Sequence, residues 1–192
     1  EDGQYGSIAS RYTKALARSM ASTKEIKAAN VLNNAQAGGF TGGDGVTLLS
    51  AAHPTTHGVQ SNVLGTAADL SETSLESVLI QISDMKDDRG LRIAAQGTQL
   101  VIPTAYQFVA ERLLESNLRT GTADNDINAV KSGGYLPKGY HVMRRLSDAD
   151  AWFIQTDVPD GLKHFVRSPM KKGMEGDFET GNVRYKVRER YS

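Results

Sequence analysis

The sequence predicts an α+β fold, in which helices and strands occupy separate parts of a chain of 192 residues. Three observations predict it. Residues 7–37 contain neither proline nor glycine and are rich in good helix formers. Residues 71–86 repeat apolar side chains at helical spacing. Residues 182–191 instead alternate apolar and charged side chains, as a strand with two different faces does.

The first helix is longer than a chain of this size can cover. Its apolar stripe consists of Ile8, Tyr12, Leu16, Met20 and Ile26. At 1.5 Å per residue, a helix over residues 7–37 would extend roughly 45 Å, several times the length of an average globular helix. We therefore expect part of it to run outside the core as a strut or to lie against a neighbouring molecule. Gly38 and Gly39 are expected to end it.

Two shorter helices are predicted in the middle of the chain. The first covers residues 71–86, and Ser71 or Asp69 can cap it. Its buried face is predicted to consist of Leu75, Val78, Leu79, Ile82 and Met85. The second begins at Pro103, where a missing N–H costs nothing. Its buried face is predicted to consist of Tyr106, Val109, Ala110 and Leu113.

Strand signals surround these helices. The strand candidates are residues 91–94, 99–102, 139–145, 151–156 and 162–170. The second of them is continuously apolar, which predicts a central position in a sheet. The only tryptophan, Trp152, is expected to anchor the core. The order of helix, strand, strand and helix therefore predicts a sheet with helices packed on it.

The C-terminal segment predicts a connection over residues 171–181 and a strand over 182–191. One face of this strand carries Val183, Tyr185, Val187 and Tyr191, with Glu189 interrupting it. The other face carries Arg184, Lys186, Arg188 and Arg190. This line of cations is a solvated face, a contact for an acidic protein surface, or a nucleic-acid contact. We favour the protein contact over nucleic acid, because the chain has no net charge and no aromatic side chain interleaves the cations.

Composition excludes several classes of function. Lys and Arg together equal Asp and Glu at 22 each, so no overall field attracts nucleic acid or an anionic membrane. The absence of cysteine excludes disulfides, thiol nucleophiles and cysteine-ligated metals. No apolar run is long enough for a membrane span. The chain begins at Glu1 and stops at Ser192 within a strand-like run, so we expect a fragment or a processed chain.

No convincing catalytic or metal site emerges from the motifs. Residues 40–45 (FTGGDG) lack the Gly-Lys-Ser/Thr of a phosphate loop and predict a flexible turn. His53 and His57 have zinc-helix spacing, but Pro54 disfavours a helix there and a loop is preferred. Residues 120–134 begin like a calcium loop but lose the pattern, which predicts a solvated loop. We expect no cofactor, and the enzyme alternative is an uncharacterised hydrolase that uses His53 or His57.

The motifs, taken in order, resemble a known family. The segments that carry the resemblance are VTLLSAAHP, LSETSLESVLIQI, RGLRIAAQGTQLVIPTAYQFVAERLLES and GDFETGNVRYKVRERYS. They resemble the major capsid protein of tailed bacteriophages, in the prophage major head subunit branch of the Hong Kong 97-type fold. The resemblance covers nearly the whole chain, and LLSAAHP and LVIPTAYQ are its most telling motifs. Its order of segments contributes most of the weight.

The resemblance implies a non-enzymatic subunit of an icosahedral shell. It implies a peripheral domain of residues 1–68 and 162–192 and an axial domain of residues 69–161. The peripheral domain would be built on a long spine helix, matched by residues 7–37, and on strands that return to it, matched by residues 162–192. The implied partners are copies of the chain in pentamers and hexamers, with scaffold, portal and non-specifically packaged DNA, and no membrane. The implied location is the virion, after assembly in the host cytoplasm. The candidate subunit-interface residues are Arg18, Lys24, Arg184, Lys186, Arg188 and Arg190.

Two features depart from the family pattern. The family has an N-terminal arm and an extended hairpin before the spine helix, whereas this sequence begins at the helix. Its closing strand also runs on beyond the position of Ser192. No position matches well enough to carry over the covalent crosslinks that some members form. Apart from the shell subunit and the hydrolase, the remaining alternative is a nucleic-acid-binding module that uses the basic strand face of residues 184–190.

Overall fold

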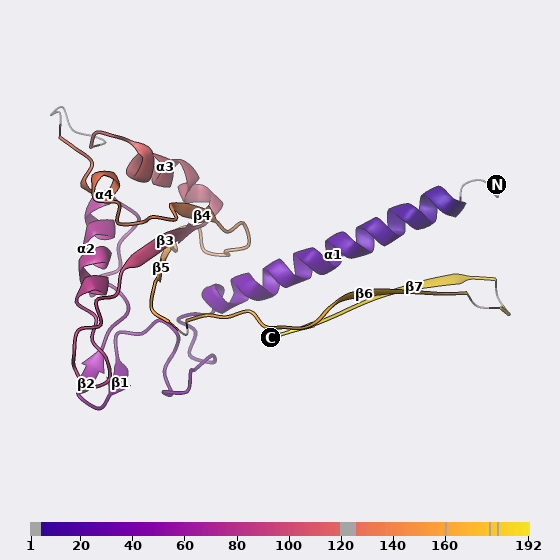
Figure 1. Ribbon diagram of the computed structural model, residues 1–192, viewed down its shortest axis with the longest axis horizontal. Helices are drawn as coiled ribbons and strands as arrows, with labels where there is room; N and C mark the ends of the chain where they lie inside the picture. The colour runs from indigo at the N-terminus through magenta and orange to yellow at the C-terminus, as the bar shows by residue number, and fades with distance from the viewer. Residues whose placement is uncertain (1–4, 120–125, 160, 177, 180) are drawn as a thin grey trace. The chain divides into compact units, whose positions relative to one another are not determined.

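The computed structural model describes residues 5–119, 126–159, 161–176, 178–179 and 181–192. Separate helices and strands follow one another along the chain, which confirms the α+β fold class (Figure 1). No helix in these ranges is both long and apolar enough to cross a membrane.

The chain groups into two compact units. The smaller unit consists of Glu1–Ala28 and Asp160–Ser192, and the larger unit consists of Ala29–Pro159. The predicted boundary near residue 161 therefore lies close to a division between units. Residues 29–68, which the resemblance places in the first part of the peripheral domain, group with the sheet and its helices in the larger unit.

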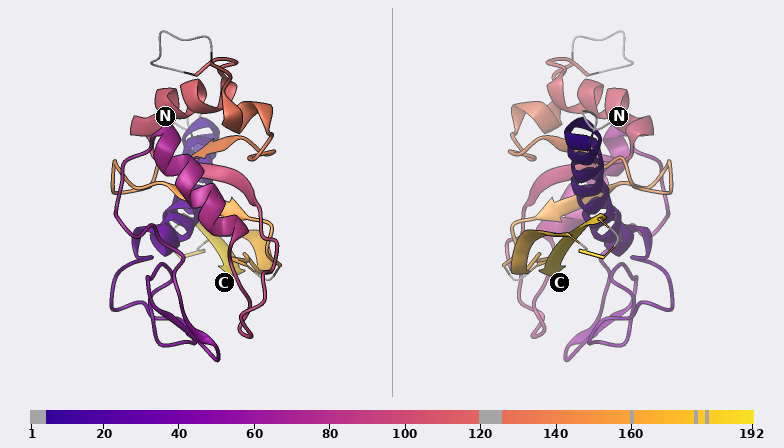
Figure 2. Two further views of the ribbon diagram at one scale, coloured as in Figure 1. Left: turned by 90° about the vertical axis from the view of Figure 1, so that its left-hand side faces the viewer. Right: turned by 90° about the vertical axis from the view of Figure 1, so that its right-hand side faces the viewer.

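The larger unit contains a three-stranded sheet in the order β4-β3-β5. In the left view of Figure 2, α2 (magenta) crosses the face of this sheet, and α3 lies at one end of it. The elements of the unit are β1 (His53–Thr55), β2 (Gly58–Gln60), α2 (Glu72–Ser83), β3 (Gly97–Ile102), the 3-10 helix η2 (Thr104–Tyr106), α3 (Gln107–Glu115), α4 (Ala129–Ser132), β4 (Tyr140–Val142) and β5 (Phe153–Thr156).

Strand β3 is central, as its apolar run predicts. It pairs in parallel with β4, where Val101 lies opposite His141, and antiparallel with β5, where Val101 lies opposite Phe153. Leu100 and Ile102 are completely buried. They share one core with Leu75 and Leu79 of α2 and with residues of α3 and α4, and Trp152 packs against this core. The Trp152 indole N–H also donates to the Ala68 carbonyl at 3.0 Å, so its predicted anchoring role is confirmed.

Helix α2 begins where the sequence predicts and ends earlier. The Ser71 hydroxyl accepts from the Ser74 N–H, and the Ser74 hydroxyl accepts from the Ser71 N–H in return, which closes a capping box. The helix ends at Ser83 instead of residue 86. The strand predicted over residues 91–94 is wrong, because the Asp87 carboxylate accepts the N–H groups of Arg89 and Leu91. This turn leaves a single bridge between Lys86 and Arg92.

The segment predicted as a solvated loop over residues 120–134 contains the short helix α4. Asn128 is 5% exposed and caps this helix with its side-chain oxygen. The solvated-loop prediction is therefore wrong for residues 128–132, where a buried asparagine organises the backbone. Asp124 of the calcium-like pattern lies outside the described residues, and Asp126 is exposed.

The smaller unit contains the long helix and a hairpin. Helix α1 (Tyr5–Asn33) is continuous over 29 residues, and its last turn belongs to the larger unit. It ends before the predicted glycine pair, because the Asn33 side chain binds the Arg145 carbonyl and the Ser147 N–H. The Asn34 side chain also donates to the Asn30 carbonyl. Such side-chain bonds to the backbone compete with the next helical turn.

The hairpin consists of β6 (Val166–Gly176) and β7 (Val183–Tyr191) in antiparallel register. Strand β7 matches its prediction, but β6 continues through residues 171–176, where the sequence predicted a connection. The glycines that suggested the connection lie inside the ladder. A side chain at Gly173 would meet the aliphatic part of Lys186 at 3.1 Å, so glycine is the residue that lets this lysine lie across the strand.

Candidate assembly surface

One ion pair joins α1 to the hairpin within the smaller unit. The Lys24 ammonium lies 2.5 Å from the Glu189 carboxylate, whose side chain is only 6% exposed. The same ammonium lies 5.4 Å from the centre of the Tyr191 ring, in cation–π position. The carboxylate that interrupts the apolar strand face therefore has a physical reason, because Glu189 meets a cation of α1. The face of β7 that carries Glu189 is the face that α1 contacts.

The strand register sorts the hairpin side chains into two faces. On the apolar face, Met174 lies opposite Tyr185, and Val166 lies opposite Tyr191. On the other face, Lys171 lies opposite Arg188, and it joins the predicted cations. We call this second set the basic face, and it consists of Lys171, Arg184, Lys186, Arg188 and Arg190. Glu175, opposite Arg184, is the single carboxylate that the register places on the basic face.

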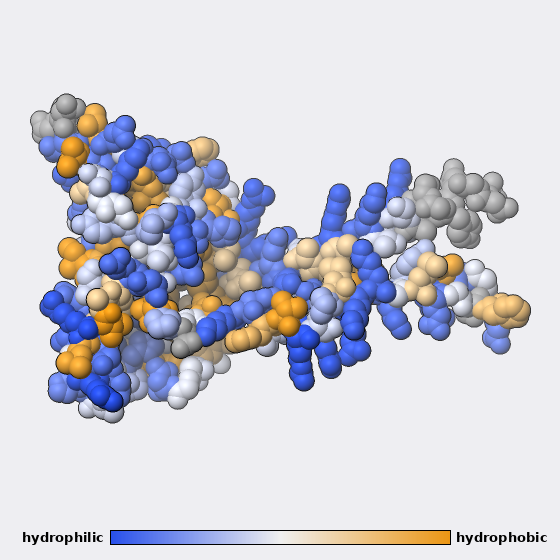
Figure 3. All heavy atoms as spheres, viewed as in Figure 1, coloured by the Kyte–Doolittle hydropathy of each residue, from blue (hydrophilic) through white to orange (hydrophobic). Residues whose placement is uncertain are grey.

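The smaller unit exposes its apolar side chains. Among residues 10–28, 161–176, 178–179 and 181–192 of this unit, no apolar residue is buried. On the hairpin, Met174 is 70% exposed and Val183 is 49% exposed, while Tyr12 of α1 is 70% exposed. Apolar residues are visible at the surface of this unit, among long polar side chains, in Figure 3. A helix and a two-stranded ribbon without a core need further apolar cover for stability.

The predicted interface residues fall into two groups. Arg184, Lys186, Arg188 and Arg190 come together on the basic face, and Arg18 is exposed on α1. Lys24 is instead engaged by Glu189 of its own chain. Sequence reasoning missed Lys171, because its place on the basic face depends on the register of β6. The available local signal was that the consecutive residues Lys171 and Lys172 would lie on opposite faces if this segment formed a strand.

The two histidines of the hydrolase alternative, His53 and His57, contact different residues. The His53 ring nitrogen Nδ1 lies 2.7 Å from the Asp44 carboxylate. This hydrogen bond, together with the Val46 N–H, lowers the pKa of Asp44. Nitrogen Nε2 of His53 is buried without a partner in the described structure. His57 instead lies against Gly90. In the described ranges, no group of three His, Asp or Glu side chains could hold a metal ion.

Replacing Gly90 with alanine is expected to destabilise the larger unit by about 1–3 kcal/mol, because the position is left-handed and crowded. Its φ is +83°, and an added Cβ would lie 2.4 Å from the His57 ring. Urea unfolding followed by Trp152 fluorescence measures the change. Gly43→Ala is the matched control, because nothing lies within 4 Å of its Cβ position. Equal unfolding midpoints for the two variants would contradict the strained contact.

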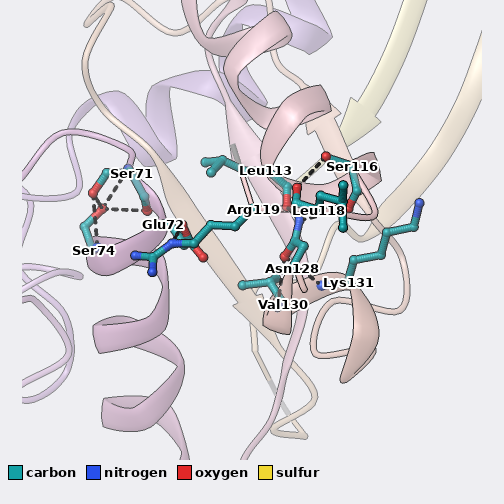
Figure 4. Close-up of polar contacts among 10 residues, drawn as sticks. All are labelled: Ser71, Glu72, Ser74, Leu113, Ser116, Leu118, Arg119, Asn128, Val130 and Lys131. Carbon is teal, nitrogen blue, oxygen red and sulfur yellow. Dashed lines mark hydrogen bonds and ion pairs between the residues drawn. The ribbon is translucent and has the colours of Figure 1, made fainter. Parts of the chain in front are cut away.

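Polar residues tie together the ends of α2, α3 and α4 in the larger unit (Figure 4). The Asn128 amide donates to the Leu113 carbonyl at 2.6 Å and to the Ser116 carbonyl at 3.1 Å. Nearby, Arg119 lies 2.9 Å from the Glu72 carboxylate. The hydrogen bond and the charge of Glu72 raise the pKa of Arg119. These contacts are structural, and sequence reasoning missed Asn128 because its partners lie on another helix.

A groove of about 590 Å³ lies between α2, β3 and α4. Leu79, Ile80 and Tyr135 line it, together with the carboxylates of Glu76 and Asp84. Asp84 forms an ion pair with Arg92 at 3.0 Å. None of the four histidines lines this groove. The hydrolase alternative therefore gains no support from the groove.

The sequence was also compared with known proteins. It matches the family model described as phage capsid protein over residues 1–192. It matched no curated protein and no solved structure.

Proposed function

Because the chain belongs to the phage capsid protein family, we propose that it is a major head subunit that assembles with copies of itself into an icosahedral shell around a phage genome. Membership of the family gives the chain a structural role in the capsid and a place in the virion. The proposal adds the closed shell, its pentamers and hexamers, and assembly in the host cytoplasm. Scaffold, portal and packaged DNA are its further proposed partners.

The proposal also assigns roles to the two units. We assign α1 as the spine helix and β6–β7 as the long strand pair of a Hong Kong 97-type peripheral domain. The sheet of β3, β4 and β5 with α2 and α3 is assigned to the axial domain. Arg18 and the basic face remain proposed contacts between subunits. Lys24 is proposed to act from within its own unit, by holding the hairpin against α1.

One observation supports self-assembly most strongly. From residue 10 onward, the described part of the smaller unit has no buried apolar residue, yet it carries apolar side chains along both α1 and the hairpin. Burial of apolar surface contributes about 25 cal/mol per Å², so covering this surface with another molecule is favourable. A shell supplies that cover with copies of the same chain.

Met174→Glu is expected to prevent assembly, because it places a charge on the apolar face of the hairpin where the native side chain is 70% exposed. Sedimentation velocity and electron microscopy, with scaffold present, measure the assembled fraction. Met174→Leu is the control, because it keeps the apolar face and should assemble as the wild type does. Unchanged Trp152 fluorescence would show that the larger unit is still folded in both variants.

Two results would count against these statements in different ways. A wild-type chain that stays monomeric at high concentration with scaffold present would contradict the shell function itself. Normal shells from Met174→Glu would contradict only the role of the apolar face.

A further inference from the structure

The two units carry opposite net charge, although the whole chain is neutral. The smaller unit contains 13 Lys and Arg against 8 Asp and Glu, a net charge of +5. The larger unit contains 9 Lys and Arg against 14 Asp and Glu, a net charge of −5. A molecule divided in this way attracts copies of itself when the unit of one sign meets the unit of the other sign.

In the smaller unit, the excess positive charge is concentrated on the basic face. The register places it on the side of β7 opposite to Glu189, which is the residue that meets α1. Lys186, Arg188 and Arg190 form no ion pair within the described part of the chain. Alternate residues of a strand lie about 7 Å apart, so these cations form a continuous line of charge. The basic face is therefore open to an acidic surface.

The larger unit offers carboxylates without counter-charges. Asp69, Asp148 and Asp150 are exposed and form no ion pair with any residue that the structure describes. Asp148 and Asp150 lie together, since the Asp148 carboxylate accepts the Asp150 N–H at 3.0 Å, and the hydrogen bond from the Trp152 indole to the Ala68 carbonyl brings the neighbouring Asp69 towards them. Burial first, and then these charges, raise the pKa of the Tyr106 hydroxyl. We call these three residues the acidic patch.

We propose that the basic face of one copy docks on the acidic patch in the larger unit of a second copy. The contact is heterologous, because it joins two different surfaces, and such contacts close into rings when the rotation between copies permits. This inference rests on the proposed shell function and names surfaces that hold neighbouring subunits together. The balanced charges of the two units also explain why a chain with a strongly basic strand face has no net charge.

A nucleic acid fits the basic face less well than a second copy does. Proteins that bind single strands combine cations with aromatic side chains on which bases stack. The register places both tyrosines of β7, Tyr185 and Tyr191, on the opposite face. Among the described residues of the basic face and their cross-strand partners, none is aromatic. The face therefore offers charge without a stacking surface, which suits a row of carboxylates.

Two charge-reversed chains test the docking. The face-reversed chain carries Lys186→Glu, Arg188→Glu and Arg190→Glu, which leave the basic face with a net negative charge, and the patch-reversed chain carries Asp148→Lys and Asp150→Lys. In either chain alone, the two surfaces carry the same sign. Each is expected to need at least about tenfold more protein than the wild type for half-assembly. In an equimolar mixture, every face can meet a patch of opposite sign on the other chain, so assembly is expected to recover.

A charge-matched control variant and a change of ionic strength test whether the loss of assembly comes from these two surfaces. Arg11→Glu with Lys14→Glu and Lys27→Glu changes the net charge of the same unit equally and should leave assembly close to wild type. Raising the ionic strength from about 0.1 to 1 M shortens the screening length from about 10 to 3 Å. Wild-type assembly should therefore weaken as salt is added, because its attraction is screened. The face-reversed chain should assemble better at high salt than at low salt, because its repulsion is screened.

The outcomes separate this inference from the shell function. Wild-type shells together with a mixture that fails to assemble would overturn the docking and leave the function standing. A face-reversed chain that assembles normally but loses DNA binding would assign the basic face to nucleic acid and overturn the docking too. A wild-type chain that never assembles would remove both. Recovery confined to the mixture supports contact between copies, because a contact within one chain cannot be restored by a partner.

Discussion

Replacing Leu75 with alanine is expected to lower the free energy of unfolding of the larger unit by about 2–5 kcal/mol. Leu75 is completely buried on the inner side of α2, in one core with Leu100 and Ile102 of the central strand. The variant loses the transfer free energy of the deleted atoms and leaves a cavity, because the surrounding strand and helices relax only in part. This loss is a large fraction of the stability of a typical domain.

The molecule provides its own probe for this experiment. Trp152 is the only tryptophan, and it packs against the same core. Urea unfolding followed by its fluorescence therefore reports on the larger unit and not on the hairpin. Ile80→Ala is the matched control, because Ile80 lies on the same helix and is 64% exposed. Its effect should stay within about 0.5 kcal/mol. Similar losses for both variants would show that the buried face of α2 is wrongly assigned.

Patterns carried by neighbouring residues predicted much of the fold. The buried face of α2 follows from the spacing of Leu75, Leu79 and Ile82, and the central place of β3 follows from its apolar run. The basic residues of β7 follow from simple alternation along one strand. In each case, a stretch of fewer than 20 residues contains the whole signal.

Features that depend on distant partners could not be predicted in the same way. The alternation in β7 gives no reason for the charge of Glu189 on the apolar face. The reason is its partner Lys24, which lies 165 residues away in the sequence but forms an ion pair with Glu189 in the fold. The glycines in residues 171–176 predicted a connection, but cross-strand pairing with β7 holds them in a strand. Lys171 joins the basic face through the same pairing. Only the part of the candidate surface on β7 could therefore be predicted from the sequence, because β7 carries a regular alternation of residue types and β6 does not.

Asn128 is a further case of this dependence on distant partners. As part of a polar, turn-rich segment it predicted a solvated loop, and nothing near it in the sequence indicates burial. Its side-chain amide reaches the Leu113 carbonyl 15 residues earlier in the chain. A short polar side chain whose partners come from another helix gives no periodic signal. Its importance can therefore be tested only by removing those bonds.

Asn128→Ala is expected to cost about 2–4 kcal/mol of stability in the larger unit, because two kinds of bond disappear together. The side-chain oxygen caps α4 by accepting the N–H groups of Val130 and Lys131. The amide nitrogen satisfies the Leu113 and Ser116 carbonyls, and a buried carbonyl left unpaired pays its desolvation cost. The Trp152 unfolding curve measures the loss. Asn117→Ala is the control, because Asn117 is exposed and lends only its backbone carbonyl to Asn128.

Asn128→Asp separates the two kinds of bond. An ionised carboxylate still caps α4, but it cannot donate, and it would face the Leu113 carbonyl oxygen at the present 2.6 Å. We expect this variant to be at least as unstable as Asn128→Ala at neutral pH. Repulsion from the carbonyls would raise the folded-state pKa of the new carboxyl above its unfolded value. The deficit should then shrink as the pH falls, because a protonated carboxyl can donate again. Wild-type stability in Asn128→Asp at neutral pH would show that the cap alone matters and that the two carbonyls do not need the amide.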